Sequence, residues 1–203
     1  MVRPRTFCEE EALDKALDVF WRHGYEGATL KVLTEAMGIN RPSMYAAFGN
    51  KEDLFRQALA RYTSIKDAVF EEAFTEPDAR SVVRHLLRRA AEMMTEPGNP
   101  VGCLSVQGCL SGKDENEPVR LELAKIRARY HDRVEVRFAD EKAAGRLPAD
   151  AEPGELAMLL SAIANGMAVQ AASGATREEL LTVAENAARV FPTQAQPQTA
   201  AAE

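Results

Sequence analysis

Residues 29–55 read TLKVLTEAMGINRPSMYAAFGNKEDLF, and this stretch decides the fold. Its first part carries apolar residues at helical spacing, which give a short helix one buried face: Leu30, Leu33, Ala36 and Met37. Gly38 then supplies the permissive backbone of a tight turn. The pattern predicts a short helix, a turn and a second helix directly after it.

The second helix is expected to have one inward and one outward face. Asn40 can cap it by accepting from the free N–H of Ser43, and Pro42 falls in the first turn, where a missing N–H costs nothing. Met44 and Phe48 are four residues apart and face inward. The outward positions are Arg41, Ser43, Tyr45 and Ala46. In a helix-turn-helix, this second helix enters the major groove of DNA.

A third helix follows from a further cap. Asn50 precedes it and Asp53 stands at its third position, which places Lys51 at a positive helix N-terminus that suits a phosphate. The helix is predicted to run from Lys51 to Phe74 and to link two domains. Its expected buried side comprises Leu54, Phe55, Ala58, Leu59, Tyr62, Ile65 and Val69.

These residues resemble the DNA-binding domain of the tetracycline-repressor (TetR) family of bacterial transcription regulators. The similarity rests on GINRPSMY at residues 38–45, on Phe48 and on KEDLF at residues 51–55. Over roughly the first 60 residues, further positions match the family: Ala12, Leu13, Ala16, Leu17, Phe20, HGY at residues 23–25 and AT at residues 28–29. Many members carry an aromatic residue or histidine just before the phenylalanine, where this chain has alanine. The operator of a relative therefore cannot be transferred to this chain.

The resemblance implies an all-α protein of two parts. Residues 1–55 are expected to form a three-helix helix-turn-helix domain, and residues 56–192 a helical domain for ligand binding and dimerisation. The tail, residues 193–203, has no periodic apolar face and is expected to be disordered. The family further implies a repressor that binds a palindromic operator as a homodimer through residues 41–48, and that a small-molecule effector releases.

The distribution of charge agrees with a DNA-binding head on an acidic body. The net charge is −6, but residues 1–51 hold seven basic and seven acidic residues, so the excess acid lies in the remaining chain. An acidic body repels DNA everywhere except at the head, which favours oriented docking. The expected DNA contacts are Arg3, Arg5, Thr29, Lys31, Asn40, Arg41, Pro42, Ser43, Tyr45, Ala46 and Lys51.

Turn residues divide the rest of the chain into further helices, with little sign of strands. Helices are predicted over residues 78–94, 117–144, 152–173 and 176–191, and Thr176 with Glu179 forms a capping box for the last. The helix at residues 117–144 has these apolar positions: Leu121, Leu123, Ala124, Ile126, Tyr130, Val134 and Phe138.

The last two predicted helices are expected to form a dimer interface, because their apolar stripes and small residues permit close helix approach. The expected contacts are Leu156, Leu160, Ile163, Met167, Leu181, Ala184 and Ala188. Two such helices from each subunit would form a four-helix bundle, as the resemblance implies. The alternative is that these helices are buried within one chain.

The segment GCLSVQGCL at residues 102–110 is the expected effector site, because it is apolar, short and bounded by helix breakers. The TetR family holds its effector pocket in the centre of the C-terminal domain. The candidate residues are Met93, Met94, Cys103, Val106, Cys109, Arg127, His131 and Met167. The alternative to an effector site is a packed core helix with small residues. Its thiols are either inert, as buried cysteines usually are, or reactive toward an electrophile.

Composition argues against other classes of protein. The three cysteines, Cys8, Cys103 and Cys109, lack metal-ligand spacing, and their odd number argues against a disulfide framework, so a reducing, cytoplasmic location is expected. No apolar run approaches the ~18 residues of a membrane-spanning helix. Scattered histidines and the lack of a phosphate-binding loop favour neither an enzyme nor a cofactor or metal site. The alternative function is a helical binding or interaction protein whose N-terminal motif only packs.

Overall fold

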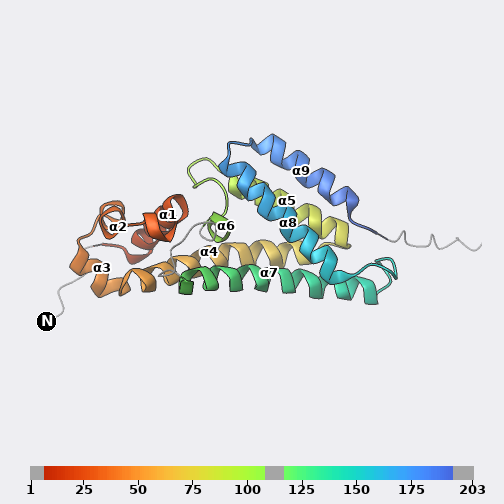
Figure 1. Cartoon of the computed structure of the whole chain (residues 1–203), viewed down its shortest axis with the longest axis horizontal. Helices are drawn as coiled ribbons and strands as arrows, with labels where there is room; N and C mark the ends of the chain where they lie inside the picture. Colours follow the sequence, from red (N-terminus) through yellow and green to blue (C-terminus); the bar gives the residue numbers. More distant parts are fainter. Residues whose placement is uncertain (1–6, 108–116, 194–203) are drawn as a thin grey trace, which may run out of the picture.

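A computed structural model describes residues 7–107 and 117–193, and within these ranges the regular structure is helical throughout. The helices are α1 (Glu9–Gly27), α2 (Leu30–Met37), α3 (Arg41–Phe48), α4 (Lys51–Phe74), α5 (Ala79–Met94), α6 (Leu104–Gln107), α7 (Glu117–Ala143), α8 (Pro153–Ala172) and α9 (Arg177–Val190). Figure 1 shows α1–α3 at one end, α4 and α7 running along the molecule, and α5, α8 and α9 covering the other end. The all-α prediction is confirmed.

The first three helices begin and end where local signals place them. Thr29 caps α2, Asn40 caps α3 and Asn50 forms a capping box with Asp53 at the start of α4. Gly38 has φ +68°, so it takes the left-handed conformation that lets the chain turn between α2 and α3. Within α2, however, Ala36 is exposed and Thr34 is buried instead. The buried Thr34 hydroxyl has a hydrogen-bond partner, because it donates to the carbonyl of Leu30 (2.8 Å).

Helix α4 spans the predicted residues and joins the two ends of the molecule. Its N-terminal half packs on α1, where the rings of Phe20 and Tyr25 meet Phe55 edge-on at centroid distances of 5.0 and 5.2 Å. Its C-terminal half packs on α5 and exchanges ion pairs with α7. The expected burial of Ile65 was wrong, because the inward stripe continues through Lys66 and Val69 and leaves Ile65 48% exposed.

The C-terminal helices complete one continuous apolar core that begins at α1. Helix α9 packs closely on α5 through its alanines, and α7 packs on α8. Leu121 of α7 was expected in the core but is 53% exposed, because Val119 and Leu123 on the opposite face make the inward contacts. At the far end of α7, the carboxylate of Glu141 is fully buried between Arg137 and Arg146.

Candidate DNA interface and central cavity

Helix α3 presents a polar outer face on an apolar base. Met44 and Phe48 are buried, and the side chain of Gln57 holds the helix end by donating to the carbonyl of Phe48 (3.0 Å). Arg41 and Tyr45 lie on the opposite face and are exposed, Tyr45 to 47%. Such a helix has the shape and exposure that reading a DNA major groove requires.

The expected DNA contacts differ in how free their polar groups are. Asn40 and Thr29 already act as caps, accepting from the backbone N–H groups of Ser43 (2.9 Å) and Val32 (3.3 Å). Pro42 and Ala46 are exposed beside Tyr45, and Ser43 is half-buried. Lys31 is exposed on α2, with Glu35 3.9 Å from its ammonium. Arg3 and Arg5 lie outside the described residues.

Lys51 lies at the N-terminus of α4, as predicted, but its ammonium has a partner within the protein. The Nζ atom stands 4.4 Å from the centroid of the Tyr25 ring, which is a cation–π distance. Burial lowers the pKa of Lys51, and the nearby carboxylate of Glu26 opposes this effect. The Lys51 ammonium therefore already contacts the Tyr25 ring of α1, and a DNA phosphate would have to bind the same ammonium.

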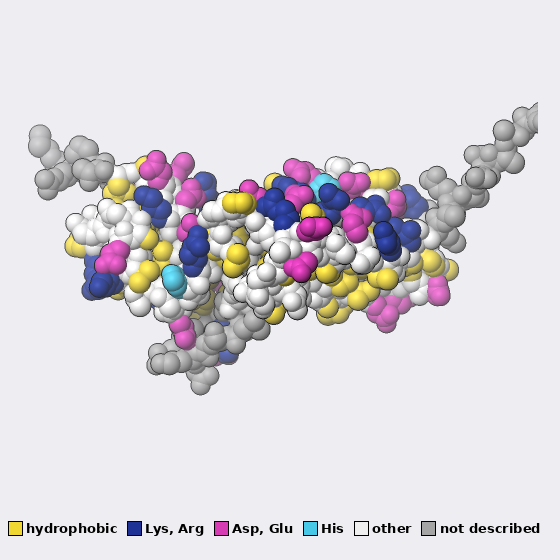
Figure 2. All heavy atoms as spheres, turned by 90° about the horizontal axis from the view of Figure 1, so that it is seen from above, with side chains coloured by type: hydrophobic (Ala, Val, Ile, Leu, Met, Phe, Trp, Pro, Cys, Tyr) yellow, Lys and Arg dark blue, Asp and Glu magenta, His cyan; other side chains and the backbone are white. Residues whose placement is uncertain are grey.

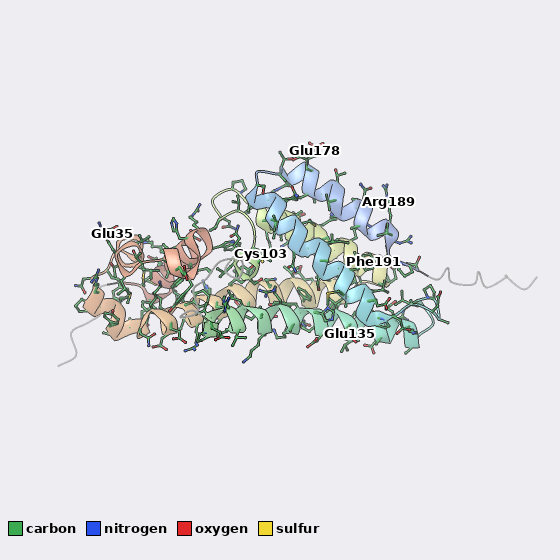
Figure 3. The ribbon with its side chains drawn as sticks, viewed as in Figure 1. Glu35, Cys103, Glu135, Glu178, Arg189 and Phe191 are labelled. Carbon is green, nitrogen blue, oxygen red and sulfur yellow. The ribbon has the colours of Figure 1, made fainter. Side chains whose placement is uncertain are left out.

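A cavity of about 130 Å³ lies where α1, α4, α5, α7 and α8 meet the segment that carries α6. Five of the expected effector residues line it: Met93, Met94, Cys103, Val106 and Arg127. Most of the remaining lining is apolar, as is usual for sites that hold small molecules. Figure 3 shows Cys103 between the α1–α3 end and the α5–α8 end of the molecule.

Three expected effector residues are not part of this lining. His131 is not among the lining residues although it stands one turn after Arg127 on α7, and its Nε2 lies 3.7 Å from the carboxylate of Glu135. Met167 is buried within the core and is not among the lining residues. Their contact with an effector stays a prediction, because the spacing of a helix gives its faces without the neighbours that each face meets. Cys109 lies outside the described residues.

The cavity also contains residues that the sequence analysis missed. Trp21 comes from α1, Tyr62, Lys66 and Phe70 come from α4, and Ser161 and Asn165 come from α8. A usable signal existed for the last two, because they are a polar pair four residues apart within an otherwise apolar stretch of α8. Nothing in the local sequence marks Trp21, since it joins the cavity only when α1 packs on α4.

The thiol of Cys103 is surrounded by polar groups although it is buried. Its Sγ lies 3.0 Å from the hydroxyl of Tyr62 and 3.2 Å from the hydroxyl of Ser105. Burial by itself raises the pKa of a thiol, but the ammonium of Lys66 and these hydrogen bonds outweigh it and lower the pKa of Cys103. The same burial raises the pKa of Tyr62 well above its ordinary value, so this hydroxyl stays protonated and is able to donate to the sulfur.

The expected dimer contacts fall into two groups. Leu160, Met167, Ala184 and Ala188 are buried within one chain, which leaves them little surface to offer a partner, so their place in a dimer interface stays a prediction. Helix α9, which carries Ala184 and Ala188, packs on α5, and Leu160 lines the cavity. Leu156, Ile163 and Leu181 are half-buried at the edge of the outer surface.

Other apolar residues of α8 and α9 are exposed instead. They are Met158, Leu159, Val169, Val183 and Val190, of which Val190 is 68% exposed. Figure 2 shows hydrophobic side chains gathered on the half of the molecule that these helices cover. By length and composition α8 is long and apolar enough to cross a membrane, but core helices of soluble proteins can be equally long and apolar.

Comparison with known families agrees with this geometry. Residues 12–58 match the model of "Bacterial regulatory proteins, tetR family", and residues 79–188 match "Tetracyclin repressor-like, C-terminal domain". The transcriptional repressor ComR of Escherichia coli (strain K12) is 32% identical over 192 residues, covering 94% of this chain and 91% of that protein. The repressor AcnR of Corynebacterium glutamicum is 30% identical over 179 residues, covering 88% and 89%.

A solved structure bound to DNA is also similar. A cysteine mutant of the TetR family regulator CifR, complexed with a 26-base-pair operator, is 42% identical with a TM-score of 0.89, covering 94% of this chain and 100% of that one. Its similarity extends over the helix-turn-helix end and the cavity end alike. The chain therefore belongs to the TetR family of bacterial regulatory proteins, which makes it a transcription regulator rather than an enzyme.

Proposed function

We propose that this chain is a repressor that binds a palindromic operator as a homodimer and leaves it when a small molecule occupies the central cavity. The observation that carries the proposal is the outer face of α3, where Arg41 and Tyr45 are exposed above the buried Met44 and Phe48. The relatives named above are repressors, and one similar regulator is solved on its operator, which supports the same reading of this chain.

Two features support a dimer: the few base pairs that one recognition helix can read, and the exposed apolar surface of α8 and α9. A single recognition helix reads few base pairs, whereas a two-fold dimer reads two half-sites ~34–36 Å apart or a multiple of that distance. Met158, Leu159 and Val169 of α8, with Val183 and Val190 of α9, form an apolar surface that a second copy would cover. Burial of this surface is the expected driving force for dimerisation.

The cavity is suited to control the head because both share helices. Tyr62 and Lys66 of α4 line the cavity, and the same helix begins directly after α3. An occupant that favours a different placement of α4 changes the spacing of the two recognition helices in the dimer. The coupling expected for such a device is ~1–3 kcal/mol, a roughly 5–150-fold change in operator affinity.

Binding to DNA from upstream of the chain's own gene tests the proposal. Fluorescence anisotropy should give sequence-selective binding by a dimer that weakens steeply as salt rises, since phosphate contacts release counterions. Equal affinity for that DNA and for a scrambled duplex would favour the helical interaction protein instead. Cytoplasmic location is part of the same proposal.

Blocking the cavity tests the effector part separately. Val106 lines the cavity, so Val106→Trp should fill it while the outer face of α3 stays intact. We expect operator release by an identified effector to disappear, or operator binding to be weak already if the indole mimics the occupied state. Val136→Trp, on the exposed face of α7, is the matched control and should respond like wild type. An undiminished response in Val106→Trp would place the effector elsewhere.

A further inference from the structure

The cavity contains a nucleophile in an unusually polar setting within an apolar wall. The Cys103 thiol meets the hydroxyls of Tyr62 and Ser105 at 3.0 and 3.2 Å, while Val106, Phe70 and Leu87 belong to the same lining. A thiolate, not a thiol, attacks electrophiles, and hydrogen-bond donors with a nearby cation stabilise the thiolate. Lys66 supplies that cation from the cavity wall and holds the pKa of Cys103 below its ordinary range despite burial.

A second feature of the same cavity calls for a hydrogen-bond acceptor. Trp21 lines the cavity and is only 6% exposed, and its indole Nε1 is buried with no hydrogen-bond partner among the described residues. A buried donor without a partner costs free energy, so such groups ordinarily find one. The Trp21 ring packs edge-on against Tyr62 at 4.9 Å, which places the indole beside the residue that contacts the thiol.

The dimensions of the cavity limit what can satisfy both groups. An apolar cavity of roughly 150 Å³ holds a benzene molecule, so about 130 Å³ accommodates a compact organic molecule of few atoms. Part of the lining on α5, α7 and α8 is half-exposed, including Met93, Arg127 and Asn165, which gives a small molecule a route from solvent.

We propose that the effector is a small α,β-unsaturated carbonyl compound that adds covalently to Cys103 while its carbonyl oxygen accepts from the Trp21 indole. This inference rests on the repressor function proposed above and assigns the chemical class of its effector. Conjugate addition matches the site because it needs a soft nucleophile and a hydrogen-bond donor for the carbonyl oxygen, and it releases no leaving group. The reaction requires no oxidant or reductant.

The bonds and protons of the step balance. The Sγ lone pair forms a carbon–sulfur bond at the β-carbon, and the electron pair of the carbon–carbon double bond moves toward the carbonyl oxygen as an enolate. The Trp21 N–H stabilises that oxygen in the way that a preorganised donor stabilises a developing oxyanion. The α-carbon then takes a proton from water, which replaces the proton that the thiol gave to solvent on ionising. The net change is loss of the S–H bond and of the carbon–carbon π bond, and gain of one S–C and one C–H bond.

The position of the adduct connects it to the head. Trp21 belongs to α1, so the added molecule would touch the helix-turn-helix domain directly as well as α4 through Tyr62. Insertion of atoms between α1 and the segment of α6 is expected to shift the head relative to the body, because packed interiors do not absorb added volume without movement.

Treatment of the full-length protein with cyclohexenone tests the proposal, and cyclohexanone is the matched compound of similar size and equal carbonyl without the conjugated double bond. Intact-protein mass spectrometry should show one cyclohexenone added, peptide mapping should place it on Cys103, and operator affinity should fall roughly 5–150-fold as the adduct forms. Cyclohexanone should leave both mass and operator affinity unchanged.

Three variants sharpen the result. Cys103→Ser should lose both adduct and response, whereas the double variant Cys8→Ser/Cys109→Ser, which keeps Cys103 as its remaining thiol, should retain both. Trp21→Phe preserves an aromatic ring but removes the N–H, and it should slow adduct formation several-fold. If Cys103→Ser does not fold, the double variant still decides, because Cys103 is its only thiol and peptide mapping identifies the modified residue.

The outcomes separate this inference from the proposed function. The inference alone is overturned if the protein binds its operator but forms no adduct on Cys103 when treated with cyclohexenone, or if it keeps its operator affinity once Cys103 is modified. An equal response to cyclohexanone also overturns it. An adduct on Cys103 in a protein that never binds DNA selectively overturns the repressor function, because mass spectrometry needs no operator.

Discussion

The reading head and the central cavity are specified by sequence signals of different range. In the head, caps and the residues they bond are two or three positions apart, as with Asn40 and the N–H of Ser43. In the cavity, Tyr62 and Cys103 are 41 positions apart, and Trp21 comes from yet another helix. The comparison teaches that the DNA-reading surface is a local property of the chain, whereas the cavity exists only after the helices have packed.

The largest expected effect comes from removing the base of the reading head. Phe48 is the last residue of α3 and only 4% exposed, so Phe48→Ala should lower the free energy of unfolding by about 3–5 kcal/mol. Urea denaturation measures this loss, and Val136→Ala on the exposed face of α7 is the control, with a change near zero. A loss below about 1 kcal/mol would mean that α3 does not depend on this contact.

The buried carboxylate of Glu141, at the far end of α7, tests the stability of the C-terminal helices. Burial by itself raises the pKa of Glu141, but hydrogen bonds from Arg146 and Arg137 outweigh it and lower the pKa of this carboxyl below its ordinary value. Glu141→Gln leaves two guanidinium groups without a carboxylate partner and should cost about 3 kcal/mol near neutral pH, the low end for breaking a buried pair.

The same pair predicts a dependence on pH. Because the folded pKa of Glu141 is lowered, its stabilising contribution is present above the unfolded value of about 4.3 and is lost as pH falls through the folded pKa. The difference in stability between wild type and Glu141→Gln should therefore be constant from about pH 6 to 8 and shrink below about pH 4. A difference that stays constant into acid would contradict this assignment.

The same contrast explains which parts of the fold could be predicted from sequence. Helices α3 and α4 have the bounds that caps, a turn glycine and helical spacing predict, residues 41–48 and 51–74, and α2 lies where its apolar residues indicate a short helix. The apolar stripe of a helix could be recognised from the sequence, but the edges of its buried face could not. Ile65 and Leu121 are exposed because the neighbouring helices pack on other faces of α4 and α7, and a sequence pattern does not show where those helices lie.

The candidate sites follow the same rule. The outward positions of α3 are determined by the helix itself, so Arg41 and Tyr45 lie where the sequence places them. Some predicted dimer contacts are buried within one chain, because small residues such as Ala184 favour close packing without indicating whether α5 or a second chain provides it. Trp21 escaped prediction because its place in the cavity depends on how α1 packs on α4.

A substitution on the outer face of the head should affect DNA and not the fold. Tyr45→Ala should cost about 1–3 kcal/mol of operator affinity if the side chain makes a specific contact, with little change in unfolding. Tyr45→Phe is the matched control, because it keeps the ring and removes the hydroxyl, and so separates stacking from hydrogen bonding. Operator titration at one fixed salt concentration measures both variants. Wild-type affinity in Tyr45→Ala would move the reading surface away from this face.

The smallest expected effect distinguishes two roles for Lys51, whose ammonium lies 4.4 Å from the centroid of the Tyr25 ring at the N-terminus of α4. If a DNA phosphate shares this ammonium, Lys51→Ala should weaken operator and random DNA by similar factors and reduce the slope of log affinity against log salt by about one. If the ammonium serves only the aromatic ring, the slope should stay at the wild-type value and the free energy of unfolding should fall by about 0.5–1 kcal/mol. Lys125→Ala removes one positive charge from the exposed face of α7 and controls for net charge alone. A slope change equal to that of Lys125→Ala would assign Lys51 to the packing of α1 on α4 and leave phosphate binding to the other basic residues of the head.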